Sequence, residues 1–182
     1  GSCDDMTDAP VYSENEAIAP EAGTADIYVL NEGLFNLNNS TLMRYSFSNG
    51  TQTPDYFKKI NKRGLGDTAN DMAIYGSKLY VVVNVSSQIE VIDLKTGTSL
   101  KQIGMLIGNG SSRQPRYITF FENKAYVCSF DGTVARIDTT SLAIEALTQV
   151  GRNPDGLCVQ NNKLYVSNSG GLDNPNYDNT VS

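Results

Sequence analysis

The chain has 182 residues, a formal net charge of −6, three cysteines and no histidine. This length allows one globular domain with a buried core, and no apolar run approaches the roughly 18 residues that a membrane helix needs. The lack of histidine excludes Cys/His zinc sites and Ser-His or Cys-His nucleophiles within these residues, and the lack of a basic stripe argues against a nucleic-acid partner.

Residues 1–26 differ in composition from the rest of the chain. They contain seven of the 20 acidic residues and no Lys or Arg, so the other 13 acids are balanced by 14 bases. An acidic leader joined to a nearly neutral body is typical of a solvated segment. We therefore expect residues 1–26 to form an acidic flexible tether and residues 27–182 to form the folded part.

The first part of the body, residues 27–62, contains three strand-like runs. Ile27–Leu30, Leu42–Phe47 and Tyr56–Ile60 predict the second, third and fourth strands of a four-stranded unit. An inner strand is missing from this first unit. A closed ring of such units often takes that strand from its other terminus.

Three further segments, 70–103, 115–150 and 154–182, resemble one another. Each has a short apolar run, a polar turn that ends in Lys, and then Leu-Tyr-Val or Ala-Tyr-Val. The first two continue into a third strand, a turn and a fourth strand. Short alternating strands that repeat about every 40 residues are the sequence signature of propeller blades. The predicted fold class is all-β, a β-propeller of four-stranded antiparallel blades.

The repeats add up to about three and a half blades, because Thr180–Ser182 only begins the third strand of the last unit. Half a ring would expose two long strand edges, which folded proteins avoid. We expect a seven-bladed ring when complete, with the remaining half of the propeller as the partner of this one. Two copies that pair edge to edge are the alternative.

Two residue types in the repeats are interpreted as structural. Tyr28, Tyr80, Tyr126 and Tyr165 recur at one repeat position and are expected to pack between blades. Cys128 and Cys158 lie within strand-like runs and are expected to be buried apolar thiols. A disulfide between them is the less favoured interpretation, because sequence spacing fixes no geometry.

These motifs resemble a known family. Pro-Asp or Pro-Arg before the inner strand, Lys-Leu-Tyr-Val, and Val-Ile-Asp-Leu-Lys-Thr-Gly resemble the YncE-like, surface-layer type of β-propeller. The opening at Ile27–Gly33 is similar to the start of its Bacteroidota cell-surface branch. Cys3-Asp4-Asp5 is similar to the lipoprotein start of that branch, in which a lipidated cysteine precedes acidic residues. An ordinary tail thiol is the alternative for Cys3.

The resemblance implies a binding protein without enzymatic activity, lipid-anchored through Cys3 to the outer membrane at the cell surface. A similar subgroup captures cobalamin and passes this corrinoid to a TonB-dependent outer-membrane transporter, and that subgroup gives the specific functional hypothesis. A structural surface-layer, adhesion or protein-interaction propeller is one alternative. A lactonase-like metal-dependent hydrolase is the other.

The candidate ligand site follows from propeller geometry. The loop that enters the inner strand and the loop between the second and third strands open on one face of each blade. The two longest, at 34–39 and 170–179, are of the kind that carries binding in repeat proteins. Aromatic faces with amide groups suit a large amphipathic ligand or a sugar. The predicted ligand-binding residues are Glu32, Phe35, Asn70, Asn84, Arg116, Tyr117, Phe130, Asn153, Asn168 and Tyr177.

No catalytic residue, metal ligand or cofactor is predicted. Residues 173–178 place several oxygen donors close together, as a calcium loop would, but they lack the rest of an EF-hand pattern, and a polar surface loop is favoured. The inner strands offer only Asp71 and Asp155 as carboxylates for a central metal, with Arg116 between them. That set is poor for a divalent ion.

Overall fold

The computed structural model describes residues 26–182. The lipidation site predicted at Cys3 and nearly all of the predicted tether lie outside these residues. The described part contains fourteen β-strands and one short helix, arranged in four antiparallel sheets. None of its helices has the length and apolar character needed to cross a membrane.

The first sheet has three strands in sequential order, β1 (Asp26–Asn31), β2 (Thr41–Ser46) and β3 (Thr51–Thr53). The strand predicted at Tyr56–Ile60 is wrong, because Tyr56–Asn61 forms the helix α1. The Asp55 side chain caps this helix by accepting a hydrogen bond from the Lys58 backbone N–H at 3.2 Å. Lys62 ends it in the left-handed conformation, with φ of 60°.

The second and third sheets each have four strands, and the fourth has three. The second sheet contains β4 (Ala69–Tyr75), β5 (Lys78–Val83), β6 (Gln88–Asp93) and β7 (Ser99–Gly104). The third contains β8 (Pro115–Phe121), β9 (Lys124–Ser129), β10 (Thr133–Asp138) and β11 (Ile144–Gln149). The fourth contains β12 (Pro154–Gln160), β13 (Lys163–Asn168) and β14 (Thr180–Val181). The predicted fold class, four-stranded antiparallel blades, is confirmed.

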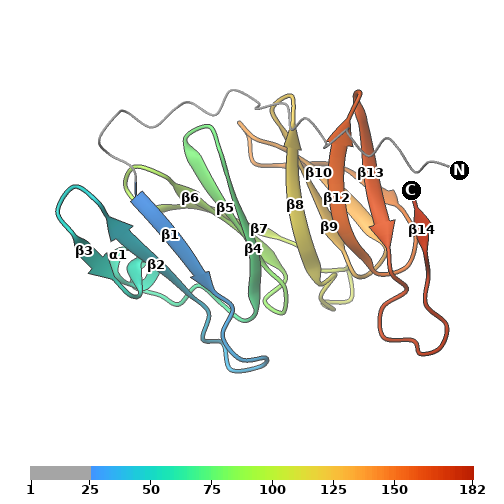
Figure 1. The fold of residues 1–182 in the computed structure, drawn as a ribbon, viewed down its shortest axis with the longest axis horizontal. Coiled ribbons are helices and arrows are strands. Elements are labelled where there is room, and N and C mark those ends of the chain that lie inside the picture. The colour runs from blue at the N-terminus through green and yellow to red at the C-terminus, as the bar shows by residue number, and fades with distance from the viewer. Residues whose placement is uncertain (1–25) are drawn as a thin grey trace, which may run out of the picture.

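The sheets stand side by side, with β4, β8 and β12 next to one another along one side of the molecule (Figure 1). These three are the inner strands. Each inner strand also lies against the second strand of the preceding sheet, β8 against β5 and β12 against β9. Since β1 lies against β4 in the same way, β1 occupies the position of a second strand, and the first sheet has no inner strand among the described residues.

Apolar side chains fill the spaces between neighbouring sheets. Tyr80 is fully buried between the second and third sheets, and its ring centroid lies 4.9 Å from that of Phe120. Burial raises the pKa of Tyr80 to about 12. Tyr28 and Tyr126 pack against the corresponding clusters. Tyr165 is 40% exposed, because no described element covers the outer face of the fourth sheet.

The two cysteines of the body have different environments. Cys128 is fully buried, and burial raises the pKa of its thiol to about 12. Cys158 is exposed, so the prediction that it is buried is wrong. It lies in β12, whose outer face is uncovered in the described residues. Both thiols are free.

An ion pair with a fully buried carboxylate joins the connection after α1 to the second sheet. Arg63, in the connection after α1, donates from its two Nη atoms to the Glu90 carboxylate at 2.9 and 3.1 Å. Glu90 is fully buried within β6 and also accepts hydrogen bonds from Ser99 Oγ and Gln102 Nε2. The Arg63 guanidinium lies over the Phe57 ring at 4.9 Å. This network fixes the link between the helix and the second sheet.

We predict that Arg63→Met lowers the free energy of unfolding by about 3–5 kcal/mol, because it leaves a buried carboxylate without its counter-charge. Glu90→Gln should cost less, since the neutral amide keeps polar partners and the Arg63 charge is partly solvated. Urea unfolding followed by circular dichroism measures both variants. Equal costs for the two would contradict this account of the pair.

Candidate functional site

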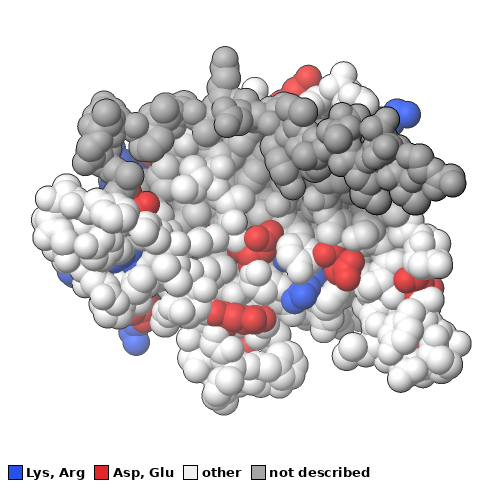
Figure 2. Space-filling model, viewed as in Figure 1, with Lys and Arg blue, Asp and Glu red and all other residues white. Residues whose placement is uncertain are grey.

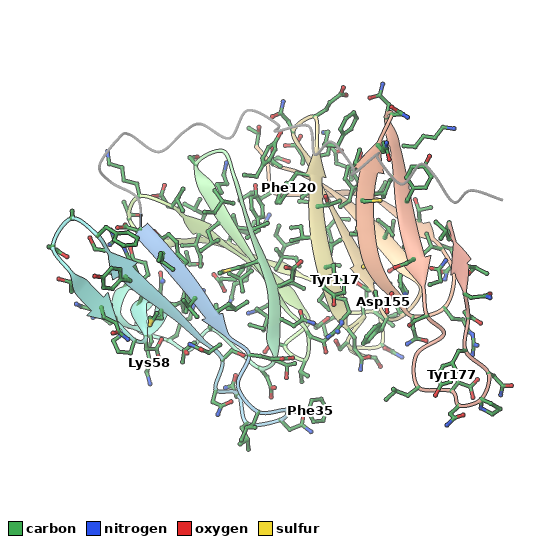
Figure 3. The ribbon with its side chains drawn as sticks, in the orientation of Figure 1. Phe35, Lys58, Tyr117, Phe120, Asp155 and Tyr177 are labelled. Atoms are coloured by element: carbon green, nitrogen blue, oxygen red, sulfur yellow. The ribbon has the colours of Figure 1, made fainter. Side chains whose placement is uncertain are left out.

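The loops that carry the predicted site emerge together at one edge of the sheets. They are 32–40 between β1 and β2, 84–87 between β5 and β6, 130–132 between β9 and β10, and 169–179 between β13 and β14. We call this edge the loop face. Phe35 and Tyr177 lie at the tips of its two longest loops (Figure 3), which form two lobes with a recess between them (Figure 2).

Each inner strand begins at the loop face with the same irregularity. One residue is passed over in the pairing with the neighbouring strand: Asn70 in β4, Arg116 in β8 and Asp155 in β12. Two residues earlier the backbone is left-handed, with φ of 59° at Thr68 and 57° at Gln114. Bulges of this kind re-aim a side chain. The same side-chain position therefore recurs at the loop-face end of each inner strand. It carries an amide in the second sheet, a guanidinium in the third and a carboxylate in the fourth.

Arg116 lies over two aromatic rings. Its guanidinium carbon is 5.3 Å from the centroid of Tyr117 and 5.0 Å from that of Phe130. Such contacts are favourable for a cation and hold a planar guanidinium in one orientation. The structure thus brings together three of the predicted site residues: Arg116 at the bulge of β8, Tyr117 next to it, and Phe130 in the loop after β9.

Asn70 and Asp71 lie in the second sheet, at the start of β4, where the third sheet has Arg116 and Tyr117. Both side-chain polar atoms of Asn70 are buried and have no hydrogen-bond partner among the described residues. Asp71 accepts hydrogen bonds from the backbone N–H groups of Met72 at 2.9 Å and Ile118 at 3.0 Å. Burial raises the pKa of Asp71, against the opposing effects of these hydrogen bonds and of the Arg116 charge. Asp71 therefore ties the second and third sheets together.

A hollow of about 210 Å³ opens beside Phe130, between the third and fourth sheets. It is lined by Phe130, Asp131, Gly132, Gln149, Val150, Gly151, Arg152 and Asn153. Two predicted site residues, Phe130 and Asn153, belong to this lining. Because Arg116 lies over Phe130, the guanidinium and the hollow share one aromatic wall.

The first long loop is held by an aspartate that the sequence did not single out. The carboxylate of Asp67, only 8% exposed, accepts the backbone N–H groups of Asn36 at 3.1 Å and Asn38 at 3.2 Å. Both asparagines have positive φ. Asp67-Thr68 precedes β4 at the repeat position that Arg113-Gln114 and Arg152-Asn153 occupy before β8 and β12. An acidic residue in place of an arginine was the sequence signal that could have pointed to Asp67.

The second long loop is held by Arg152. Its guanidinium pairs with Asp178 at 2.9 Å and Asp173 at 3.1 Å and donates to the Asn176 backbone carbonyl. An arginine therefore stands between the carboxylates that the calcium alternative would need. Residues 26–182 contain no cluster of three or more acidic or cysteine side chains placed to hold a metal ion.

Other predicted site residues have local structural partners. Asn84 is buried and donates to the Pro115 carbonyl at 2.9 Å, which links the second sheet to the start of β8. Asn168 is buried and donates to Ser182 Oγ at 3.0 Å within the fourth sheet. Glu32 is exposed at the base of the first loop. Asn84 therefore lies next to the bulge that carries Arg116, whereas no hydrogen bond among residues 26–182 joins the side chain of Asn168 or Glu32 to Arg116, Tyr117 or Phe130.

We predict that Asp67→Ala releases the 32–40 loop, because two backbone N–H groups lose their acceptor. Chymotrypsin should then cut at Leu34, Phe35 or Leu37 at least tenfold faster than in the unchanged chain, as followed by mass spectrometry. Asp67→Asn, which keeps one acceptor oxygen, serves as the control and should cut at an intermediate rate. Unchanged cleavage in Asp67→Ala would show that the loop is held by other contacts.

Antiparallel four-stranded sheets that pack face to face beside a shared inner edge define the chain as part of a β-propeller. The chain belongs to the family described as Domain of unknown function (DUF5074), whose model matches residues 25–174. No curated protein matches the sequence at a significant level.

Solved structures of β-propellers are similar in fold. The WD40 repeats of RRP9 match with a TM-score of 0.58 and 13% identity over 78% of this chain and 42% of that one. The WD40 propeller domain of Doa1 matches with a TM-score of 0.52 and 16% identity over 76% and 46%. The computationally designed Ika4 protein matches with a TM-score of 0.57 and 15% identity over 81% and 85%. The chain thus spans less than half of the two WD40 structures.

Proposed function

We propose that this chain is a binding protein that captures a small ligand on its loop face without chemical turnover. The observation that carries the proposal is the Arg116 guanidinium over Tyr117 and Phe130, beside a hollow of about 210 Å³. A site with an aromatic wall and a few polar groups suits an amphipathic ligand. Our specific candidate is a corrinoid such as cobalamin, which is large, flat and rimmed with amides.

The construction of the loop face supports binding. Its two long loops are held by charged side chains from the segments before β4 and β12, through Asp67 and Arg152. A surface held in place before the ligand arrives loses less conformational entropy on binding. Asp71, the inner-strand carboxylate beside Arg116, already accepts two backbone N–H groups, and this supports a binding role over a hydrolytic one.

We further propose that Cys3 carries a lipid, that the protein stands on the outer membrane at the cell surface, and that it passes its ligand to a TonB-dependent transporter. The support is the motif Cys3-Asp4-Asp5, which is similar to a lipidated cysteine followed by acidic residues, and the acidic stretch after it. The several acyl chains of a lipoprotein would hold such a protein firmly at a membrane.

A second candidate function is favoured by the tip of the first loop. Leu34, Phe35 and Leu37 are 65%, 68% and 58% exposed, although the loop that carries them is held by hydrogen bonds. Leu172, on the second long loop, is fully exposed. Exposed apolar side chains on ordered loops are typical of a protein-interaction surface. An interaction propeller would use these tips instead of the hollow between them.

Titration of the full chain with cyanocobalamin in a calorimeter tests the corrinoid candidate. We expect saturable binding at micromolar or lower concentration, and a loss of at least tenfold in affinity for Phe130→Ala, which removes the aromatic wall. Phe47→Ala is the matched control, because Phe47 is exposed in the turn between β2 and β3, away from the loop face. The absence of heat at micromolar concentrations would rule out the corrinoid.

Processing in cells tests the anchor. If Cys3 is lipidated, blocking signal peptidase II with globomycin should cause the unprocessed precursor to accumulate, and Cys3→Ser should move the protein from the membrane to the soluble fraction. Cys158→Ser is the control and should leave the protein membrane-bound. A soluble protein in untreated cells would contradict the anchor while leaving the binding site untouched.

A further inference from the structure

We infer that Arg116 is the receptor for an anionic group of the ligand bound at the loop face. The other arginines of the chain show what is unusual about it. Five of the six pair with a carboxylate: Arg44 with Asp26, Arg63 with Glu90, Arg113 with Asp131, Arg136 with Glu145, and Arg152 with Asp173 and Asp178. Among residues 26–182, Arg116 has no such partner.

The state of the individual Arg116 atoms supports this inference. Its Nε is buried and lacks a hydrogen-bond partner within the described part of the chain. Its two Nη atoms also donate no hydrogen bond there, yet they are not among the buried unpartnered atoms. Nε is therefore covered, while Arg116 as a whole is only half-buried. This leaves the Nη side as the side from which a group could approach the guanidinium.

The aromatic rings hold this open cation in place. A guanidinium stacked on Tyr117 and Phe130 keeps its plane fixed, so less side-chain entropy is lost when a ligand binds. A planar guanidinium presents parallel N–H donors that match the oxygens of a carboxylate or a phosphate. Because Phe130 also lines the 210 Å³ hollow, a ligand in that hollow would contact the same aromatic ring that the guanidinium lies over.

The inner-strand carboxylates near Arg116 already accept hydrogen bonds, which leaves them less available as ligands of a divalent cation. Asp71, a carboxylate of the preceding sheet on which the Arg116 charge acts, accepts two backbone N–H groups. Asp155, at the same bulge position in β12, accepts from Ser167 Oγ at 3.1 Å. Figure 2 shows one basic patch, flanked by acidic patches, above the recess between the two lobes. Asn70, with its unpartnered amide at the equivalent bulge of β4, would add a neutral hydrogen-bonding group.

The first experiment tests the anion site without assuming any particular ligand. Inorganic phosphate and sodium acetate are titrated separately into the full chain at constant ionic strength, and the Arg116 Nε–H resonance is followed by NMR. The resonance is assigned to Arg116 because it disappears from the spectrum of the Arg116→Lys variant. We expect a saturable shift with at least one anion, and the stronger one identifies phosphate or carboxylate as the preferred group.

Arg136 is the matched control for this titration. It lies on β10, is 46% exposed and pairs with Glu145 at 3.2 Å. Its Nε–H resonance should show no saturable shift. If Arg116 shows no saturable shift with either anion, or if Arg136 shifts equally, the anion site is refuted.

The second experiment rests on the proposed function, because it takes cobalamin as the ligand. Cobalamin carries one anionic group, the phosphodiester of its nucleotide loop, and cobinamide lacks it. Arg116→Met should weaken cyanocobalamin binding by about 10- to 100-fold and change cobinamide binding by less than about threefold. Arg136→Met should change neither.

The two experiments separate the failure of each hypothesis. If the unchanged chain binds neither corrinoid but Arg116 still shows a saturable anion shift, the proposed ligand is wrong and the anion site stands. If both corrinoids bind and Arg116→Met weakens them equally or not at all, the corrinoid hypothesis stands and the role of Arg116 is overturned.

Discussion

The packing of one sheet against the next is the constraint on which the rest of this structure depends. The second and third sheets are covered on both faces, and the strands in their middle are accordingly buried on both faces, most completely in the second sheet. In β5 every residue after Lys78 is buried, and in β6 four consecutive residues are buried. Fully buried Tyr80 marks the space between these sheets. Hydrophobic burial of this kind supplies most of the favourable free energy of folding.

Because both faces of the central sheets are used for packing, the strands have little surface left for recognition. The polar groups that could meet a ligand are confined to the ends of the strands and to the loops. The bulge at the start of each inner strand adds to this, since it places one side chain at the rim of the loop face without disturbing the packing behind it. A rigid core with variable rim positions lets one fold carry different binding sites.

Much of the fold could be predicted from the sequence, because short runs of β-branched and aromatic residues alternate with turn residues, and Lys-Leu-Tyr-Val or Lys-Ala-Tyr-Val recurs at one repeat position. The two incorrect predictions have different causes, one local and one in the arrangement of the sheets. Tyr56–Ile60 looks like a strand because its apolar residues are β-formers, but the cap at Asp55 and the buried pair Tyr56 and Phe57 favour a helical turn. Cys158 fits the same pattern as Cys128, and only the arrangement of the sheets shows that its face is uncovered. The site was less predictable, because it depends on contacts between residues far apart in the chain. The pairing of Asp67 with the loop around Asn36 spans 31 positions, and no spacing rule anticipates it.

The distribution of charge sets Arg116 apart from the other cations of the body. The body of the chain is close to neutral, and its arginines are used mainly as structural ties: Arg63 to the second sheet, Arg113 to the turn at Asp131, and Arg152 to its own long loop. An arginine that only stabilised the fold would be expected to pair with a carboxylate as these do. Arg116 is stacked and left open at the rim instead, and an arginine held in this way is suited to a group that arrives from outside the chain.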